Sequence, residues 1–154
     1  IISLRAVDNE FYGFQDNCVN AANRMEKDGR LSAQDASALR LLSLFGSLIA
    51  NNDQHFGNVS LIMAAGDKRC TLAPAYDQLP MLYRPLDGVT ATHSFTPSSA
   101  TAAACREWPS ALDSACLFWD QAQTDPRISE LFRRICAENL QILNRLKSSP
   151  QLIS

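Results

Sequence analysis

The chain has 154 residues, of which 46% are hydrophobic and 19% charged, and its formal net charge at pH 7 is −2. This composition is typical of one globular domain over residues 1–154 and excludes disordered and collagen-like chains. Because no apolar stretch reaches the roughly 18 residues of a membrane-spanning helix, we expect no membrane association and a cytoplasmic location. The near-neutral charge also argues against a uniformly basic nucleic-acid-binding protein.

The cysteines are scattered along the chain. No pair forms a C-x-x-C motif, and the sequence has only two histidines, so neither a zinc site nor a disulfide framework is indicated. We therefore predict reduced, mostly buried thiols at all five positions, Cys18, Cys70, Cys105, Cys116 and Cys136.

Helical periodicity begins near the N-terminus. Apolar residues from Phe14 to Met25 recur at helical spacing, and Asp28 and Gly29 then supply a stop. Ser32 is a predicted N-cap for a second helix that runs to about residue 50. Apolar side chains cover nearly every face of this second helix, so we expect it to be central and buried.

The composition changes abruptly after the second predicted helix. Residues 51–58 are polar, and a loop on a rigid helix is a common place for functional residues. Short apolar runs at 59–63 and 69–72, separated by a turn, predict a β-hairpin. Pro74 and Pro80 bracket the next segment, which we expect to be a fixed loop.

The C-terminal half returns to helical patterns. Residues 83–97 are aperiodic and predict a long connection, and residues 100–106 form a short alanine-rich segment. A helix is expected to end near Gln123. Asp125 and Pro126 then predict the N-cap and first position of a final helix. The predicted fold class is therefore mainly α with one short β-hairpin.

Three oxygen-bearing side chains flank the predicted hairpin. Asp53 and Asn58 lie in the polar loop before it, and Asp77 follows it. Phosphoryl transfer requires a carboxylate near the attacking hydroxyl and hard oxygen ligands that hold Mg²⁺ against the nucleotide phosphates. The D-x4-N spacing and the order of these parts match the catalytic loop of protein kinases. The pair alone is weak evidence, since loops collect Asp and Asn for structural reasons.

The longer strings are more specific. Residues 52–60, Asn-Asp-Gln-His-Phe-Gly-Asn-Val-Ser, and residues 72–77, Leu-Ala-Pro-Ala-Tyr-Asp, resemble the N-x-D-x-H-x-x-N-x-S and L-x-P-x-Y-D signatures of HipA-like serine/threonine kinases. The resemblance implies the C-terminal lobe of a protein-kinase-like fold. It also implies Asp53 as catalytic base, Asn58 and Asp77 as Mg²⁺ ligands, and Asp77 and Tyr76 beside the ATP.

His55 and Ser60 belong to the same signature. His55 is assigned to the catalytic site, and we expect it to hold the loop by hydrogen bonds, with direct contact to substrate or phosphate as the alternative. Ser60 is expected to fix the junction of loop and strand, because no base is evident that would make it a nucleophile.

A kinase of this kind also needs a phosphate-covering loop and a strand lysine, and neither precedes Asp53 in this sequence. The chain also begins at Ile1 without an initiator methionine. We therefore expect the N-terminal lobe to lie upstream, and these residues to be inactive by themselves.

The resemblance also implies partners. It suggests a toxin whose protein substrate is typically an aminoacyl-tRNA synthetase, and a DNA-binding antitoxin or fused DNA-binding domain. A net positive charge on the final helix is expected to be a solvated face, with a phosphate or nucleic-acid contact as the alternative. An alternative function is a kinase-like scaffold of a DNA-binding regulator or toxin–antitoxin complex, although intact Asp53, Asn58 and Asp77 argue against an inactive scaffold.

Overall fold

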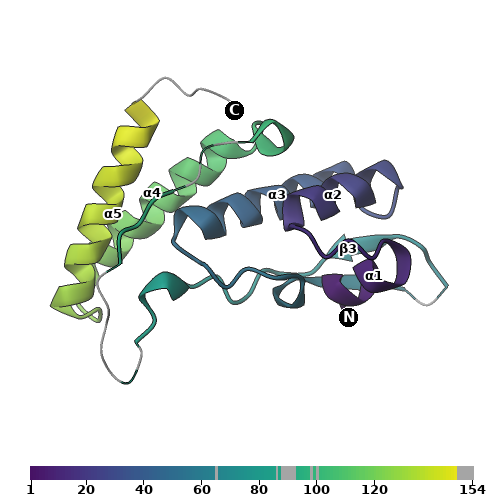
Figure 1. Ribbon diagram of the computed structural model, residues 1–154, viewed down its shortest axis with the longest axis horizontal. Coiled ribbons are helices and arrows are strands. Elements are labelled where there is room, and N and C mark those ends of the chain that lie inside the picture. Colours follow the sequence, from purple (N-terminus) through teal and green to yellow (C-terminus); the bar gives the residue numbers. More distant parts are fainter. Residues whose placement is uncertain (65, 86, 88–92, 98, 100, 149–154) are drawn as a thin grey trace. The chain divides into compact units, whose positions relative to one another are not determined.

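The computed structural model describes residues 1–64, 66–85, 87, 93–97, 99 and 101–148. It confirms a mainly helical chain with a small sheet (Figure 1). Two compact units are present: unit 1 contains Ile1–Ser43 and Asp53–Gln78, and unit 2 contains Leu44–Asn52 and Leu79–Ser154. The boundary at Ser43 falls inside one helix, and all candidate site residues belong to unit 1.

Unit 1 contains an antiparallel sheet of three strands, in the order β1 (Ile2–Ser3), β2 (Ser60–Met63) and β3 (Cys70–Leu72). The predicted hairpin corresponds to β2 and β3, in which Leu61 lies opposite Leu72. The third strand was not predicted. It is only two residues long, and Ile2 pairs with Leu61 across a long sequence separation that no local pattern reveals.

The helices of unit 1 differ from the prediction at the N-terminus. Helix α1 (Leu4–Phe11) was not predicted, and α2 (Cys18–Lys27) begins four residues later than the apolar pattern suggested. Asn17 is the N-cap of α2, because its side chain accepts a hydrogen bond from the Asn20 amide. The helix therefore begins only at the next residue. Phe14 therefore lies outside the helix, with 64% of its surface exposed.

Helix α3 (Ala33–Leu48) begins as predicted. The Ser32 hydroxyl oxygen accepts a hydrogen bond from the Asp35 amide at 3.0 Å and donates to the Asp35 carboxylate at 3.0 Å. These bonds satisfy groups that the first helical turn leaves without an intrahelical partner. No residue from 41 to 48 is exposed, so the expected burial is confirmed for the second half of the helix, whereas Ala33, Gln34 and Ala38 in the first half are exposed.

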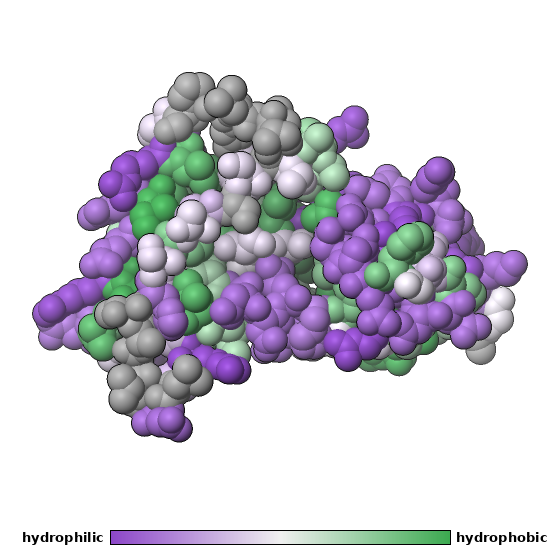
Figure 2. Space-filling model, viewed as in Figure 1, coloured by the Kyte–Doolittle hydropathy of each residue, from purple (hydrophilic) through white to green (hydrophobic). Residues whose placement is uncertain are grey.

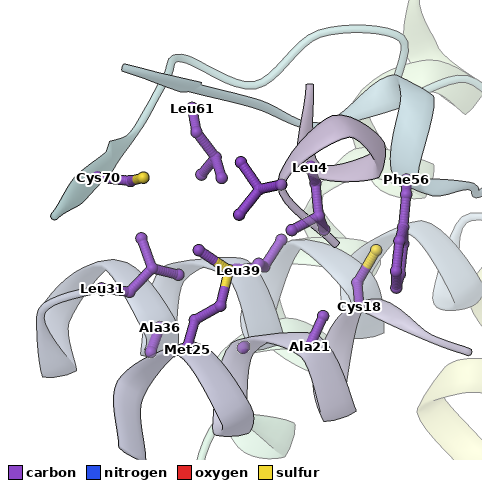
Figure 3. Packing of buried hydrophobic residues seen from close by; sticks show 12 residues of the cluster. Leu4, Cys18, Ala21, Met25, Leu31, Ala36, Leu39, Phe56, Leu61 and Cys70 are labelled. Atoms are coloured by element: carbon purple, nitrogen blue, oxygen red, sulfur yellow. The ribbon is translucent and has the colours of Figure 1, made fainter. Parts of the chain in front are cut away.

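The core of unit 1 joins its sheet to its helices. Figure 3 shows Leu61 and Cys70 directed from the sheet toward Met25, Leu31 and Leu39, which come from the helices and the connection before α3. Leu4 of α1 and Phe56 of the polar loop belong to the same cluster. The loop that carries the candidate catalytic residues is therefore anchored in the core by its own phenylalanine.

A buried ion pair connects α1 to α2. Asp8 is only 1% exposed, and its carboxylate receives hydrogen bonds from the Arg24 guanidinium at 3.3 Å and the Gln15 amide at 2.8 Å. Arg24 also binds both oxygens of Asp16 at 2.8 Å. This contact lowers the pKa of Asp16 to about 2. The buried charge of Asp8 is thus paired, as the energetics of burial require.

In unit 2, helices α4 (Trp108–Thr124) and α5 (Glu130–Ser148) lie side by side (Figure 1). Two short 3₁₀ helices, Met81–Tyr83 and Ala102–Ala104, precede them. The end of α4 is close to the prediction, but the start of α5 was wrong. Asp125 binds the Arg127 amide at 2.9 Å and so forms a turn. The Ser129 hydroxyl, which accepts a bond from the Phe132 amide, lies directly before the helix.

Aromatic residues form the centre of unit 2. Trp119 is fully buried, and its indole N–H donates to the Leu48 carbonyl at 3.1 Å, at the last residue of α3. Tyr83 and Phe132 pack on Trp119 and on each other. The Tyr83 hydroxyl exchanges two hydrogen bonds with the buried Asn139 amide, at 2.9 and 3.1 Å. This polar pair is therefore satisfied within an apolar centre.

The predicted connection over 83–97 lies partly outside the described residues, as does residue 100 of the alanine-rich segment. All five cysteines are free, as predicted; Cys18, Cys70 and Cys136 are buried and the other two half-buried. Burial raises the pKa of the Cys18 and Cys136 thiols to about 11, so both are neutral thiols at physiological pH.

On the face shown in Figure 2, hydrophilic residues surround separate hydrophobic areas. Within the described ranges, no helix has the length and apolar character needed to span a membrane. On the final helix, Arg134 pairs with Glu130 and Lys147 with Asp113 of α4, as expected for a solvated charged face.

Candidate functional site

The candidate loop is shaped by one short turn of 3₁₀ helix, η1 (Phe56–Asn58). His55 precedes it as N-cap, and its ring Nδ1 accepts a hydrogen bond from the Gly57 amide at 3.0 Å. The His55 carbonyl accepts from the Asn58 amide at 2.9 Å. His55 therefore holds the loop through both side chain and backbone, as the sequence predicted.

The structure brings together the two predicted metal ligands. The side-chain amide of Asn58 donates to Asp77 Oδ2 at 2.8 Å, across 19 residues of sequence. The same amide lies 3.3 Å from the backbone carbonyl of Asp53, to which it also donates. Asn58 thus connects the loop that carries the candidate base with the segment that follows the hairpin.

Asp77 has an unusual backbone conformation. Its φ is +57°, in the left-handed region that non-glycine residues rarely adopt, although Asp tolerates it better than most. Left-handed residues of this kind are found at functional sites when the surrounding structure holds them. Here the Asn58 bond is one such constraint on the Asp77 side chain.

Tyr76 links the same two segments from its hydroxyl group. The hydroxyl donates to the Gly57 carbonyl at 2.9 Å and lies 3.0 Å from Ser60 Oγ. Because a phenol has one proton, Ser60 is the donor in the second bond. Ser60 therefore stabilises the junction of loop and strand, where the sequence placed it. Tyr76 remains 43% exposed, so its ring is accessible.

Arg5 is a residue of this region that sequence reasoning missed. Its guanidinium Nη2 lies 3.4 Å from His55 Nδ1. The guanidinium comes from α1, 50 residues before His55. No local motif marked it, because α1 itself was not predicted. The signal that marks it is a basic residue in the first turn of a helix, and this signal is visible only once α1 is known.

The oxygen donors suit Mg²⁺ better than a softer metal. The described part of the chain has no group of three or more His, Cys, Asp or Glu side chains that could hold a metal ion. One carboxylate, from Asp77, and one amide, from Asn58, are held together instead. Mg²⁺ commonly takes one or two such protein ligands and completes its shell with water and substrate phosphates.

Comparison with known proteins supports the sequence motifs. A family model described as HipA-like C-terminal domain matches residues 4–142. The chain is 33% identical over 139 residues to Toxin YjjJ of Escherichia coli strain K12, and this match covers 90% of the chain. The chain spans 31% of the length of that curated relative. No solved structure matches the chain.

Proposed function

The chain belongs to the HipA-like C-terminal domain family, and from this premise we propose that it is the catalytic lobe of a HipA-type serine/threonine protein kinase. The reaction is transfer of the γ-phosphoryl group of ATP to a Ser or Thr hydroxyl of a protein. The observation that carries the proposal is the hydrogen bond of 2.8 Å between Asn58 and Asp77, beside the Asp53 backbone. This bond joins two of the three motif residues, and a second bond from the same Asn58 amide reaches the backbone carbonyl of the third, Asp53.

Each of these residues has a role that its chemistry supports. Asp53 would orient the acceptor hydroxyl and take its proton, because a carboxylate in hydrogen-bond reach suits that task. Asn58 and Asp77 would hold Mg²⁺, which when bound neutralises charge on the ATP phosphates. The Tyr76 ring, fixed by its hydroxyl and partly exposed, would lie beside the nucleotide.

The rest of the machinery is proposed to lie in an N-terminal lobe that supplies the lysine and the phosphate-covering loop. The match covering less than a third of Toxin YjjJ is compatible with such a division. The family context also supports a toxin–antitoxin setting, with a protein such as an aminoacyl-tRNA synthetase as substrate and a DNA-binding antitoxin or fused DNA-binding domain as partner. If the chain is instead a kinase-like scaffold, changing the motif residues should leave assembly of the DNA-binding regulator or toxin–antitoxin complex intact.

The substitution Asp53→Asn in the full-length protein tests the assignment of the base. The amide keeps the shape of the carboxylate but cannot accept the proton, so we expect phosphoryl transfer from labelled ATP to fall by roughly 100-fold or more. The thermal unfolding midpoint should change little. Activity within a few-fold of the wild type would contradict the assignment of Asp53 as the base, whereas a full-length wild type that transfers no phosphoryl group would favour the scaffold.

The substitution Asn58→Ala tests the metal site. If Asn58 is a ligand, its loss weakens Mg²⁺ binding, and raising the Mg²⁺ concentration should partly restore ATP binding measured by calorimetry. The Asp53→Asn variant serves as the control, because its ATP binding should keep the Mg²⁺ dependence of the wild type. An identical Mg²⁺ dependence in the Asn58 variant and the wild type would remove the assignment of Asn58 as a ligand.

A further inference from the structure

Arg5 is an exposed residue whose guanidinium group lies against the candidate catalytic loop. Its Nη2 is 3.4 Å from His55 Nδ1 and would lie 3.5 Å from a Cβ atom built on Gly57. The guanidinium and the His55 ring therefore occupy the same face of Gly57. This arrangement places a permanent positive charge against His55, which lies two residues after the candidate base Asp53 in the sequence.

The backbone of α1 is fixed to the loop directly before Arg5. Ser3 pairs with Ser60 in the sheet, and the Leu4 amide donates to the Val59 carbonyl at 2.8 Å. The Leu4 side chain is buried in the core of unit 1. Arg5 is thus the next residue after an anchored one, and its backbone cannot move away from the loop without breaking these contacts.

The position of Arg5 in α1 is electrostatically unfavourable for the helix itself. The N-terminus of a helix carries a partial positive charge and favours acidic side chains. The first turn of α1 contains no acidic residue, and it places Arg5 at the second helical position. Residues that violate such a local preference are expected at functional sites, where another contact compensates for the local cost.

The Arg5 guanidinium contacts the His55 ring. The ring Nδ1 accepts a hydrogen bond from the Gly57 amide at 3.0 Å, so its single lone pair points at that amide. Arg5, which can only donate, shares this lone pair through a second and longer contact of 3.4 Å. A Cβ atom on Gly57 would come within 2.8 Å of the ring, so the glycine leaves room for the imidazole in this position.

We propose that Arg5 is a positioning residue for phosphoryl transfer, which holds the His55 ring against Gly57 and thereby fixes the segment from Asp53 to Asn58. This inference rests on the proposed function, because it concerns the same site. A displacement of about 1 Å in a catalytic group can lower the rate of an enzyme by roughly 100-fold. A residue that holds the loop therefore acts on the rate of the chemical step more than on nucleotide affinity.

The contact itself can be tested without any activity. The chain has two histidines, so His93→Gln assigns the remaining imidazole signals to His55 in long-range ¹H–¹⁵N spectra. We expect a protonated Nε2 and an unprotonated Nδ1, and a shifted Nδ1 resonance in Arg5→Ala. The control Arg69→Ala removes another exposed arginine of unit 1 and should leave the resonance unchanged. A protonated Nδ1, or no shift in Arg5→Ala, overturns the proposal.

The role in catalysis is tested by hydrolysis of Mg²⁺–ATP in the full-length protein. Arg5→Ala should lower kcat by roughly 10- to 100-fold with little change in the KM for ATP, and Arg5→Lys should recover part of the loss. A raised KM with unchanged kcat would show direct nucleotide contact and overturn the positioning role. The wild type and Asp53→Asn are measured in parallel: a wild type that neither hydrolyses ATP nor transfers a phosphoryl group refutes the proposed function. An inactive Asp53 variant beside a fully active Arg5→Ala refutes this inference alone.

Discussion

The His55 ring, and not a left-handed backbone angle, favours glycine at position 57. A Cβ atom at this position would lie 2.8 Å from His55 Cε1 and 2.9 Å from Nδ1, closer than such atoms approach in practice. The ring cannot yield freely, because it accepts the Gly57 amide hydrogen bond. A Cβ atom on residue 57 would therefore push the exposed His55 ring out of this hydrogen bond.

The substitution Gly57→Ala is expected to displace the His55 ring and lower the free energy of unfolding by about 0.5–1.5 kcal/mol, the net contribution of the hydrogen bond that is lost. Phosphoryl transfer by the full-length protein should fall more steeply than its stability. The double variant His55→Ala, Gly57→Ala supplies the control, because removing the ring relieves the clash. Denaturant unfolding measures the free energies of unfolding. If Gly57→Ala lowered this free energy equally with and without the His55 side chain, the clash with the ring would not explain the loss.

The site residues within the motif were predictable, whereas Arg5 was not. Asn58 and Asp77 lie on either side of a hairpin, and the pairing of β2 with β3 brings such flanking residues together. The sequence therefore contains the information for this contact locally. Arg5 reaches His55 through β1 and α1, whose pairing with β2 depends on a strand of two residues.

At the scale of elements, the missed helix and the misplaced helix starts have specific physical causes. α1 has a charged residue, Asp8, on its buried face, so its apolar periodicity is interrupted. Phe14 has the spacing of a core residue, but it lies outside α2 against the Arg24 guanidinium, 4.7 Å from ring centroid to Cζ. Asp125 resembles an N-cap, but it bonds Arg127 in a turn before α5. Polar side chains thus overrode the pattern of apolar residues.

The ion pair between α1 and α2 gives a prediction for the substitution Arg24→Met. It leaves the buried Asp8 carboxylate without its cation, and breaking such pairs lowers the free energy of unfolding by about 3–5 kcal/mol. Arg69→Met, which affects only an exposed pair with Asp67, should change it by less than about 1 kcal/mol. Urea unfolding of both variants measures the difference, and equal effects would contradict the importance of the buried pair.

Arg24 also pairs with Asp16, and this second ion pair predicts the direction of a pH effect. Arg24 lowers the pKa of Asp16 in the folded state, to about 2, so the associated stability is present above the ordinary Asp pKa of about 3.9. It is lost as the pH falls through about 2. The wild type should therefore lose more stability than Arg24→Met between pH 4 and pH 2.

At the scale of the whole chain, the two units each have an apolar centre, while the candidate site lies in unit 1 alone. Catalysis by positioning requires the ATP phosphates to be held on both sides, and this sequence offers no glycine-rich loop before Asp53. The 154 residues thus contain the apolar cores of both units, but no glycine-rich loop that could cover the phosphates precedes Asp53 in them. Folding and catalysis should therefore separate in the 154-residue chain.

We accordingly predict that the 154-residue chain by itself is folded and mostly helical but binds Mg²⁺–ATP weakly or not at all and transfers no phosphoryl group. Circular dichroism with a thermal melt measures folding, and calorimetric titration with Mg²⁺ and ATP measures binding. A longer protein that adds the proposed N-terminal lobe is the control and should bind and turn over ATP. Micromolar ATP binding, or phosphorylation of the chain itself, would show that these residues already contain a complete site and that no second lobe is needed.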